Sequence, residues 1–138
     1  MIAIAVTDDI ATCRALRRVV FIEEQGVSEA DEIDDLDPVA THLLATADGR
    51  PVGSARIVPA DGAGKVGRVC VLAEARGTGL GAALMRAAVA ECRRMGLKKV
   101  KLGAQVHALG FYEKLGFTAV GAVFDDAGIP HREMVLPL

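Results

Sequence analysis

Arg76-Gly77-Thr78-Gly79-Leu80-Gly81 joins a β-branched, strand-like run to a long helical pattern. The first turn of a helix leaves four backbone N–H groups without partners, and the helix dipole adds partial positive charge there. Glycines remove the Cβ atoms that would keep a phosphate away from these donors, while Arg76 adds a charged fork and Thr78 a hydroxyl. The segment therefore predicts a binding site for a diphosphate group at the start of a helix.

Other interpretations of the glycine segment depend on the residues that follow it. A P-loop needs Lys and then Ser or Thr after its last glycine, and Ala82-Ala83 in that place excludes it. A dinucleotide fingerprint needs an acidic residue about twenty positions further on, and residues 97–102 contain none. A turn whose glycines only let a strand and a helix pack closely remains open from this segment alone.

Apolar periodicity places strands and helices on both sides of this segment. Strands are predicted at 2–6, 41–47, 51–58, 65–72, 98–102, 117–124 and 132–136, and helices at about 9–21, 80–95 and 106–115. Asp48-Gly49-Arg50 is typical of a hairpin turn. The segment from Glu23 to Asp37 has eight acidic residues and no basic one, and we expect a loop with a short helical piece there.

The order of these elements predicts the fold class. Hairpins connect most of the strands, and one parallel crossover runs through the long helix. We expect an α/β (α+β) fold, in which helices cover the faces of a mixed sheet. The apolar face of the long helix is predicted to consist of Leu80, Leu84, Ala87, Ala88, Cys92 and Met95.

Composition excludes several classes of protein. With 138 residues, we expect a single domain over 1–138. A net charge of −2 without a basic run argues against nucleic acid, and no apolar stretch is long enough to span a membrane. The spacing of the three cysteines, Cys13, Cys70 and Cys92, is not that of metal ligands, so we expect reduced thiols. The N-terminus lacks a signal-peptide pattern, so we expect a cytoplasmic location. His42, His107 and His131 are too scattered to predict a metal site.

Two further motifs accompany the glycine segment. Gly67-Arg68-Val69-Cys70-Val71-Leu72 precedes it, and Phe111-Tyr112-Glu113-Lys114-Leu115-Gly116-Phe117 follows it. Together with Arg-x-x-Gly-x-Gly and the order of elements, these motifs resemble the GNAT superfamily of acyl-CoA-dependent N-acetyltransferases over nearly the whole chain. The resemblance implies a mostly antiparallel sheet with one central parallel pair and about four flanking helices. It also implies acetyl-CoA as co-substrate.

The resemblance assigns the donor half of the site. In this family the strand before the glycine segment separates from the next parallel strand, and the backbone corresponding to Val69, Cys70 and Val71 contacts the pantetheine arm. An N–H from this backbone can polarise the thioester carbonyl. Residues 76–81 then hold the pyrophosphate. Gln105 stands where the family usually has an Asn that contacts the pantetheine.

Tyr112 is the only tyrosine in the chain. In the family, the tyrosine at this motif position lies near the thioester sulfur and acts as a general acid on the departing thiolate. From spacing alone, Tyr112 fits equally a core aromatic packed beside Phe111 and Phe117.

The acceptor half rests on less specific signals. In this family the segment after the first helix borders the acceptor site, so Glu23 and Glu24 are candidates for the base or for acceptor binding. The acidic segment is either a negative mouth for a cationic amine or a solvated face. His107 or His131 is a further candidate base, and each is also consistent with an ordinary surface histidine.

These inferences predict an N-acetyltransferase. It is expected to move acetyl from acetyl-CoA to a primary amine, on a small molecule or peptide, by direct attack in a ternary complex without a metal. The alternative is a non-catalytic acyl-CoA-binding sensor or interaction module of the same fold. An exposed last strand would also allow a homodimer to form by strand pairing.

Overall fold

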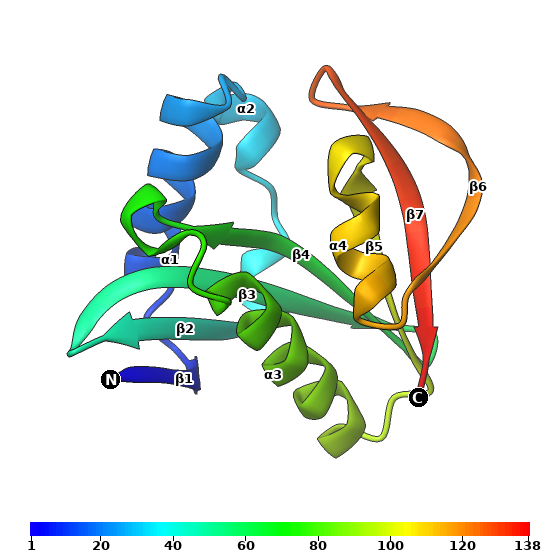
Figure 1. The fold of residues 1–138 in the computed structure, drawn as a ribbon, viewed down its shortest axis with the longest axis horizontal. Helices are drawn as coiled ribbons and strands as arrows, with labels where there is room; N and C mark the ends of the chain where they lie inside the picture. Colours follow the sequence, from blue (N-terminus) through cyan, green and yellow to red (C-terminus); the bar gives the residue numbers. More distant parts are fainter.

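A seven-stranded sheet organises the molecule, and the computed structural model describes all residues 1–138. The strand order is β1-β2-β3-β4-β5-β7-β6, and only β4 and β5 run parallel (Figure 1). The strands are β1 Ile2–Thr7, β2 Thr41–Ala47, β3 Arg50–Ala60, β4 Ala63–Val71, β5 Lys99–Gln105, β6 Thr118–Asp126 and β7 Ile129–Pro137. The α-helices are α1 Ile10–Arg17, α2 Glu29–Glu32, α3 Leu80–Arg94 and α4 Leu109–Lys114. The predicted fold class, with its one parallel pair and four helices, is therefore confirmed.

The central parallel pair is short. Only Ala63, Gly64 and Lys65 of β4 pair with Lys99, Val100 and Lys101 of β5, and beyond these pairs the two strands diverge (Figure 1). A bulge on β4 lies next to the divergence, because the register with β3 shifts between Ser54 and Arg56. Each strand keeps a partner on its other side, β3 for β4 and β7 for β5. A gap therefore opens in the middle of an otherwise continuous sheet.

Helices cover the two faces of the sheet. The α3 helix buries Leu80, Leu84, Met85, Ala88, Val89 and Cys92 against the main core. Ala87, which the sequence predicted for this face, is partly buried against the core, and Met85 and Val89 are buried there in addition to the predicted residues. On the opposite face, α1 packs Leu16 and Val20 against Cys70 in a smaller cluster. The alternation of side chains along β3 separates the two faces, with Ile57 in the main core and Arg56 facing α1.

Two sequence predictions need correction. The first helix does not end near residue 21, because it continues as a π-helical segment, η1, from Arg18 to Glu24. The last strand, β7, is not at an edge: it lies between β5 and β6, so β6 is the exposed edge strand. A hairpin whose second strand pairs with β5 necessarily leaves its first strand outside.

Buried ion pairs join α1 and β3 to the acidic segment. Arg17 and Asp37 are each 2% exposed, and Arg17 Nη1 donates to Asp37 Oδ1 at 2.8 Å. Arg17 also binds both oxygens of Glu32, at 2.6 and 3.0 Å. Arg56 donates to Asp37 at 2.9 Å and to Asp34 at 2.8 Å. From the sequence, the acidic segment has no basic residue of its own and could be a solvated face. In the structure, arginines that are distant in sequence neutralise part of it, so it is not purely a solvated face.

The close approach of α3 to β4 depends on Gly64. A Cβ at this position would lie 2.5 Å from Cys92 Sγ and 3.2 Å from Ile57 Cγ2. We therefore expect Gly64→Ala to destabilise the protein by about 1–3 kcal/mol through overpacking. The matched control is Gly67→Ala on the same strand, where a Cβ meets nothing within 4 Å. Thermal or urea unfolding checks this, and equal losses in both variants would contradict it.

The arginine–carboxylate cluster predicts a loss of stability in acid. Burial works to raise the pKa of Asp37, but its hydrogen bonds from Arg17, Arg56 and Arg14 together hold that pKa well below its usual range. The Arg56 hydrogen bond lowers the pKa of Asp34 to about 2. Stability from these carboxylates is present above their unfolded pKa of about 4 and is lost as the pH falls toward 2 and below.

Asp37→Asn tests this directly. It removes one of the two carboxylates that Arg17 and Arg56 each bind, and leaves Glu32 and Asp34 as their remaining counterions, so we expect a loss of about 3 kcal/mol at neutral pH. The free energy of unfolding should also fall less steeply between pH 4 and pH 2 than in the wild type. Asp35→Asn is the control, because Asp35 is exposed and makes no ion pair. Identical unfolding curves for the two variants would contradict a structural role for Asp37.

Candidate active site

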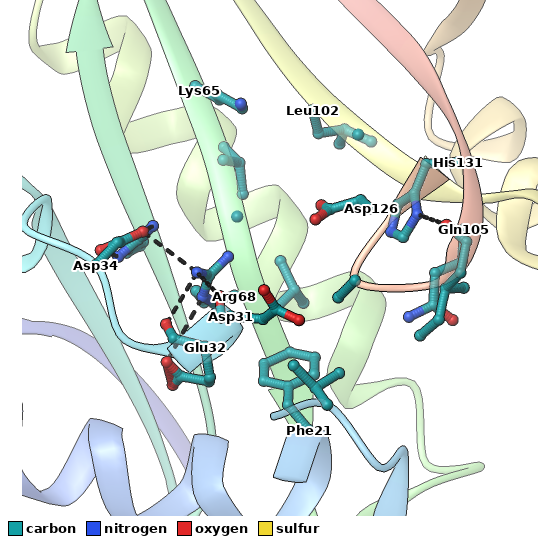
Figure 2. Close-up of a pocket in the computed structure, with 18 of the residues that line it drawn as sticks. Phe21, Asp31, Glu32, Asp34, Lys65, Arg68, Leu102, Gln105, Asp126 and His131 are labelled. Atoms are coloured by element: carbon teal, nitrogen blue, oxygen red, sulfur yellow. Dashed lines mark hydrogen bonds and ion pairs between the residues drawn. The ribbon is translucent and has the colours of Figure 1, made fainter. Parts of the chain in front are cut away.

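A pocket of about 410 Å³ fills the gap between β4 and β5 (Figure 2). One wall is β4 from Lys65 to Val69, and the facing wall is β5 with Leu102 and Gln105. The end of the first helix, the acidic segment, Tyr112 of α4 and the β6–β7 hairpin complete the lining. β3 contributes Arg56 and Val58, so seven parts of the chain meet where β4 and β5 diverge.

The glycine segment lies at the N-terminus of α3, outside the lining of this pocket. Gly77 and Gly79 have φ values of +77° and +83°, and a Cβ on either would point into open space. None of the backbone N–H groups of residues 77–82 donates to an acceptor within the protein. This row of free donors at a helix N-terminus fits an anionic diphosphate group. The Thr78 hydroxyl is not one of these donors, since it bonds the Ala75 carbonyl at 2.6 Å.

Arg76 is engaged with protein groups rather than free. Its Nε donates to the Val71 carbonyl at 3.0 Å, and its Nη1 lies 2.8 Å from the Glu24 carboxylate. The Arg76 side chain is 44% exposed, so it remains accessible beside the glycine segment. The structure thus places Glu24 next to the predicted diphosphate site, and neither Glu24 nor Glu23 lines the pocket. Glu23 is exposed and lies 4.0 Å from Arg18.

The strand residues of the predicted donor site fall on both sides of β4. Val69 lines the pocket, whereas the Cys70 side chain is buried on the α1 face, with Sγ 3.3 Å from Ser54 Oγ. Val71 offers its carbonyl to Arg76. Gln105, at the end of β5, also lines the pocket and donates to Gln25 at 3.1 Å. The route from the glycine segment to the pocket therefore runs along the end of β4.

Tyr112 packs among aromatic side chains and also lines the pocket. Its ring packs edge-on against Phe111 and Phe117, with centroids 4.9 and 6.1 Å apart. It also lines the pocket, and its hydroxyl makes no hydrogen bond within the protein. Burial raises the pKa of this phenol, so it stays protonated at neutral pH. This hydroxyl, on a half-buried side chain and without a partner in the protein, faces the pocket as a possible hydrogen-bond donor.

His131 is the histidine that the fold brings to the pocket. It is 8% exposed and stacks on Phe124, with ring centroids 5.8 Å apart. Its Nδ1 lies 2.7 Å from the Ile129 carbonyl, which can only accept a hydrogen bond. Nδ1 therefore carries the proton, and Nε2 of the neutral ring keeps its lone pair. His107 is exposed, bonds Gln105 and does not line the pocket.

Sequence reasoning did not assign four charged residues of the pocket: Arg56, Lys65, Arg68 and Asp126. Arg68 has a φ of +51°, which is unusual for a residue other than glycine, and no local pattern indicates it. Asp126 was expected in a turn between two strands but is the last residue of β6, and only the tertiary fold brings this end of the hairpin to the pocket. No group of three or more His, Cys, Asp or Glu side chains is arranged to hold a metal ion. None of the helices has both the length and the apolar character needed to cross a membrane.

Known proteins share this architecture. Residues 19–138 match the family described as the acetyltransferase (GNAT) domain. The uncharacterized N-acetyltransferase YjcF of Bacillus subtilis is 37% identical over 121 residues, which cover 87% of this chain and 86% of that protein. An acyl-CoA N-acyltransferase structure from Pseudomonas aeruginosa is 32% identical, with a TM-score of 0.89 over 98% of this chain and 99% of that one.

A more distant structure shows the same fold. An aminoglycoside 6′-N-acetyltransferase complexed with coenzyme A is 21% identical, with a TM-score of 0.78 over 98% of this chain and 96% of that one. Since the family match and relatives above 30% identity both cover most of the chain, this protein belongs to the GNAT family of acetyltransferases.

Proposed function

We propose that this protein transfers an acetyl group from acetyl-CoA to a primary amine by direct attack in a ternary complex. One observation carries the proposal: free backbone N–H groups at residues 77–82 lie at the N-terminus of α3, shortly after β4, the strand that forms one wall of the pocket. The relatives named for acyl-CoA transfer, and the coenzyme A complex of a protein with the same fold, support this donor.

The residues present fit acetyl-CoA at its pyrophosphate and along its pantetheine arm. The backbone N–H groups of residues 77–82 would hold the pyrophosphate, with Arg76 alongside as a charged donor. The backbone of Val69 to Val71 and the Gln105 side chain would hold the pantetheine arm. When bound, acetyl-CoA supplies a thioester whose carbonyl carbon accepts the amine and whose sulfur departs as a thiol.

Tyr112 and His131 supply the proton transfers in this proposal. The amine nitrogen forms the new C–N bond as the C–S bond breaks, and the nitrogen loses one proton. His131 Nε2 accepts that proton, because Nδ1 is held by Ile129. The Tyr112 hydroxyl, which is protonated at neutral pH like any phenol, donates a proton to the departing sulfur. Both side chains line the same pocket, on elements that approach it from different sides.

The cysteines do not suit a covalent route. Burial raises the pKa of Cys70, the one nearest the proposed donor site. Burial also raises the pKa of Cys13 and Cys92 to about 11. A thiolate is the nucleophilic form of cysteine, so these buried thiols are poor acyl carriers. Direct attack by the amine is the simpler chemistry.

The donor site is tested with Gly79→Ala. The Ala Cβ would enter the space in front of the free N–H groups, and we expect at least a tenfold weaker Kd for acetyl-CoA, about 1.4 kcal/mol. Gly49→Ala is the matched control, because Gly49 has a φ of +82° against +83° for Gly79 and also faces open space. It imposes the same backbone strain in the β2–β3 turn. Calorimetry measures both, and an unchanged Kd for Gly79→Ala would contradict the assignment.

The chemical step is tested by thiol release from acetyl-CoA with a panel of primary amines. We expect Tyr112→Phe to lower kcat about 10- to 100-fold with little change in the Kd for acetyl-CoA, because only a hydroxyl is removed. His131→Gln should lower kcat by a similar factor, again with little change in the Kd for acetyl-CoA. Binding of acetyl-CoA without thiol release for any amine would favour the sensor or interaction module instead.

A further inference from the structure

The acceptor pocket contains unpaired charges of both signs. Lys65 and Arg68 enter it from β4, Asp31 from α2 and Asp126 from the end of β6 (Figure 2). Lys65, Asp31 and Asp126 take part in no ion pair within the protein. A pocket built only for a cationic amine would not need the two basic residues.

Arg68 is the most informative of these residues. The β4 bulge and a φ of +51° direct it between the acidic segment and the pocket. Its Nη2 donates to the Glu32 carbonyl at 3.0 Å and to Asp34 Oδ2 at 3.2 Å. Its Nε is buried without a hydrogen-bond partner, and its Nη1 makes no hydrogen bond within the protein. The Nε and Nη1 groups of Arg68 therefore have no hydrogen-bond acceptor within the protein.

The charge balance of the arginine–carboxylate cluster also favours an anion beside Arg68. Arg14, Arg17, Arg56 and Arg68 face only three carboxylates in the cluster, those of Glu32, Asp34 and Asp37. The cluster thus keeps an excess of one positive charge. Arg14 is its most exposed member, at 57%, but does not line the pocket; of the two arginines that do, Arg68 is the more exposed, at 24% against 6% for Arg56. Lys65, three residues earlier on β4, adds an exposed positive charge to the same wall.

The acidic side chains lie on other walls of the same hollow. Figure 2 shows the carboxylates of Asp31 and Asp126 pointing into the space that Arg68 and Lys65 border, with His131 beside Asp126. An ammonium group is attracted to the two carboxylates; after it loses one proton to solvent, His131 is placed to take the second as the C–N bond forms. An anion on the same molecule is attracted to the β4 wall.

We propose that the acceptor is a zwitterion: a primary amine that also carries a carboxylate or phosphate, which Lys65 and Arg68 bind. This inference rests on the proposed function and narrows its acceptor class. It replaces the purely cationic amine that the acidic segment suggested, because arginines neutralise most of that segment while the β4 wall stays positive.

The test compares acceptors of equal length that differ only in their second group. One set is 4-aminobutyrate, butylamine and 1,4-diaminobutane, with shorter and longer homologues alongside, and the phosphate arm is phosphoethanolamine against ethanolamine. We expect kcat/KM at least tenfold higher for the anionic member of one set than for its neutral and dicationic partners. Preference for the carboxylate or the phosphate arm identifies the anion.

Lys65→Glu tests the wall without threatening the fold, since Lys65 is exposed and unpaired. This variant should reverse the order of preference, so that kcat/KM is higher for 1,4-diaminobutane than for 4-aminobutyrate. Arg68→Gln should bring the ratio of anionic to neutral acceptor to within about twofold. Lys99→Gln removes an exposed lysine of β5 that does not line the pocket, and its ratio should equal that of the wild type.

Three outcomes overturn the inference in distinguishable ways. Equal use of the three members by the wild type, or a preference for the diamine, refutes the zwitterion and leaves the transferase intact. A wild-type preference for the anion that survives Lys65→Glu refutes the role of the β4 wall. Binding of acetyl-CoA without turnover of any amine refutes the proposed function itself, and the inference with it.

Discussion

The parting of β4 and β5 after three paired residues is the constraint on which the other features depend. Inside a sheet, a strand that loses its partner exposes backbone N–H and C=O groups that must be satisfied by something else. Here each strand keeps one neighbour, β3 or β7, so the sheet stays intact while one edge of each strand faces a gap. That gap is the pocket, and the end of β4 leads from it toward the N-terminus of α3.

The arginine–carboxylate cluster holds the acidic segment against the same strands. Desolvating Arg17 and Asp37 opposes folding, and their mutual hydrogen bonds offset that penalty only because the geometry satisfies both groups. Such a cluster contributes more to position than to net stability. It fixes Glu32 and Asp34 at the pocket wall and draws Arg68 toward them, and this leaves Asp31 pointing into the hollow.

The two halves of the site differ in physical character. The donor half is mostly backbone: free N–H groups at a helix terminus and the unpaired edge of a strand. The proposed acceptor half is made of side chains from parts of the chain that are distant in sequence, with charges of both signs. Backbone donors recognise any molecule that carries the same diphosphate, whereas side chains distinguish one amine from another. Acceptor choice can therefore vary between proteins that share this fold and donor.

The sequence by itself determined the elements whose signals are local. The glycine segment before a long amphipathic helix, the hairpin at Asp48-Gly49 and the aromatic motif around Tyr112 all lie where the pattern indicated. Only the tertiary structure decided the charges of the acceptor side. Glu24 pairs with Arg76 and Asp37 pairs with Arg17, while Arg68 lines the pocket. These ion pairs form between side chains that are close in space but up to 52 residues apart in sequence. Such pairings depend on strand register and on a bulge that no local pattern specifies, so they become visible only once the sheet is assembled.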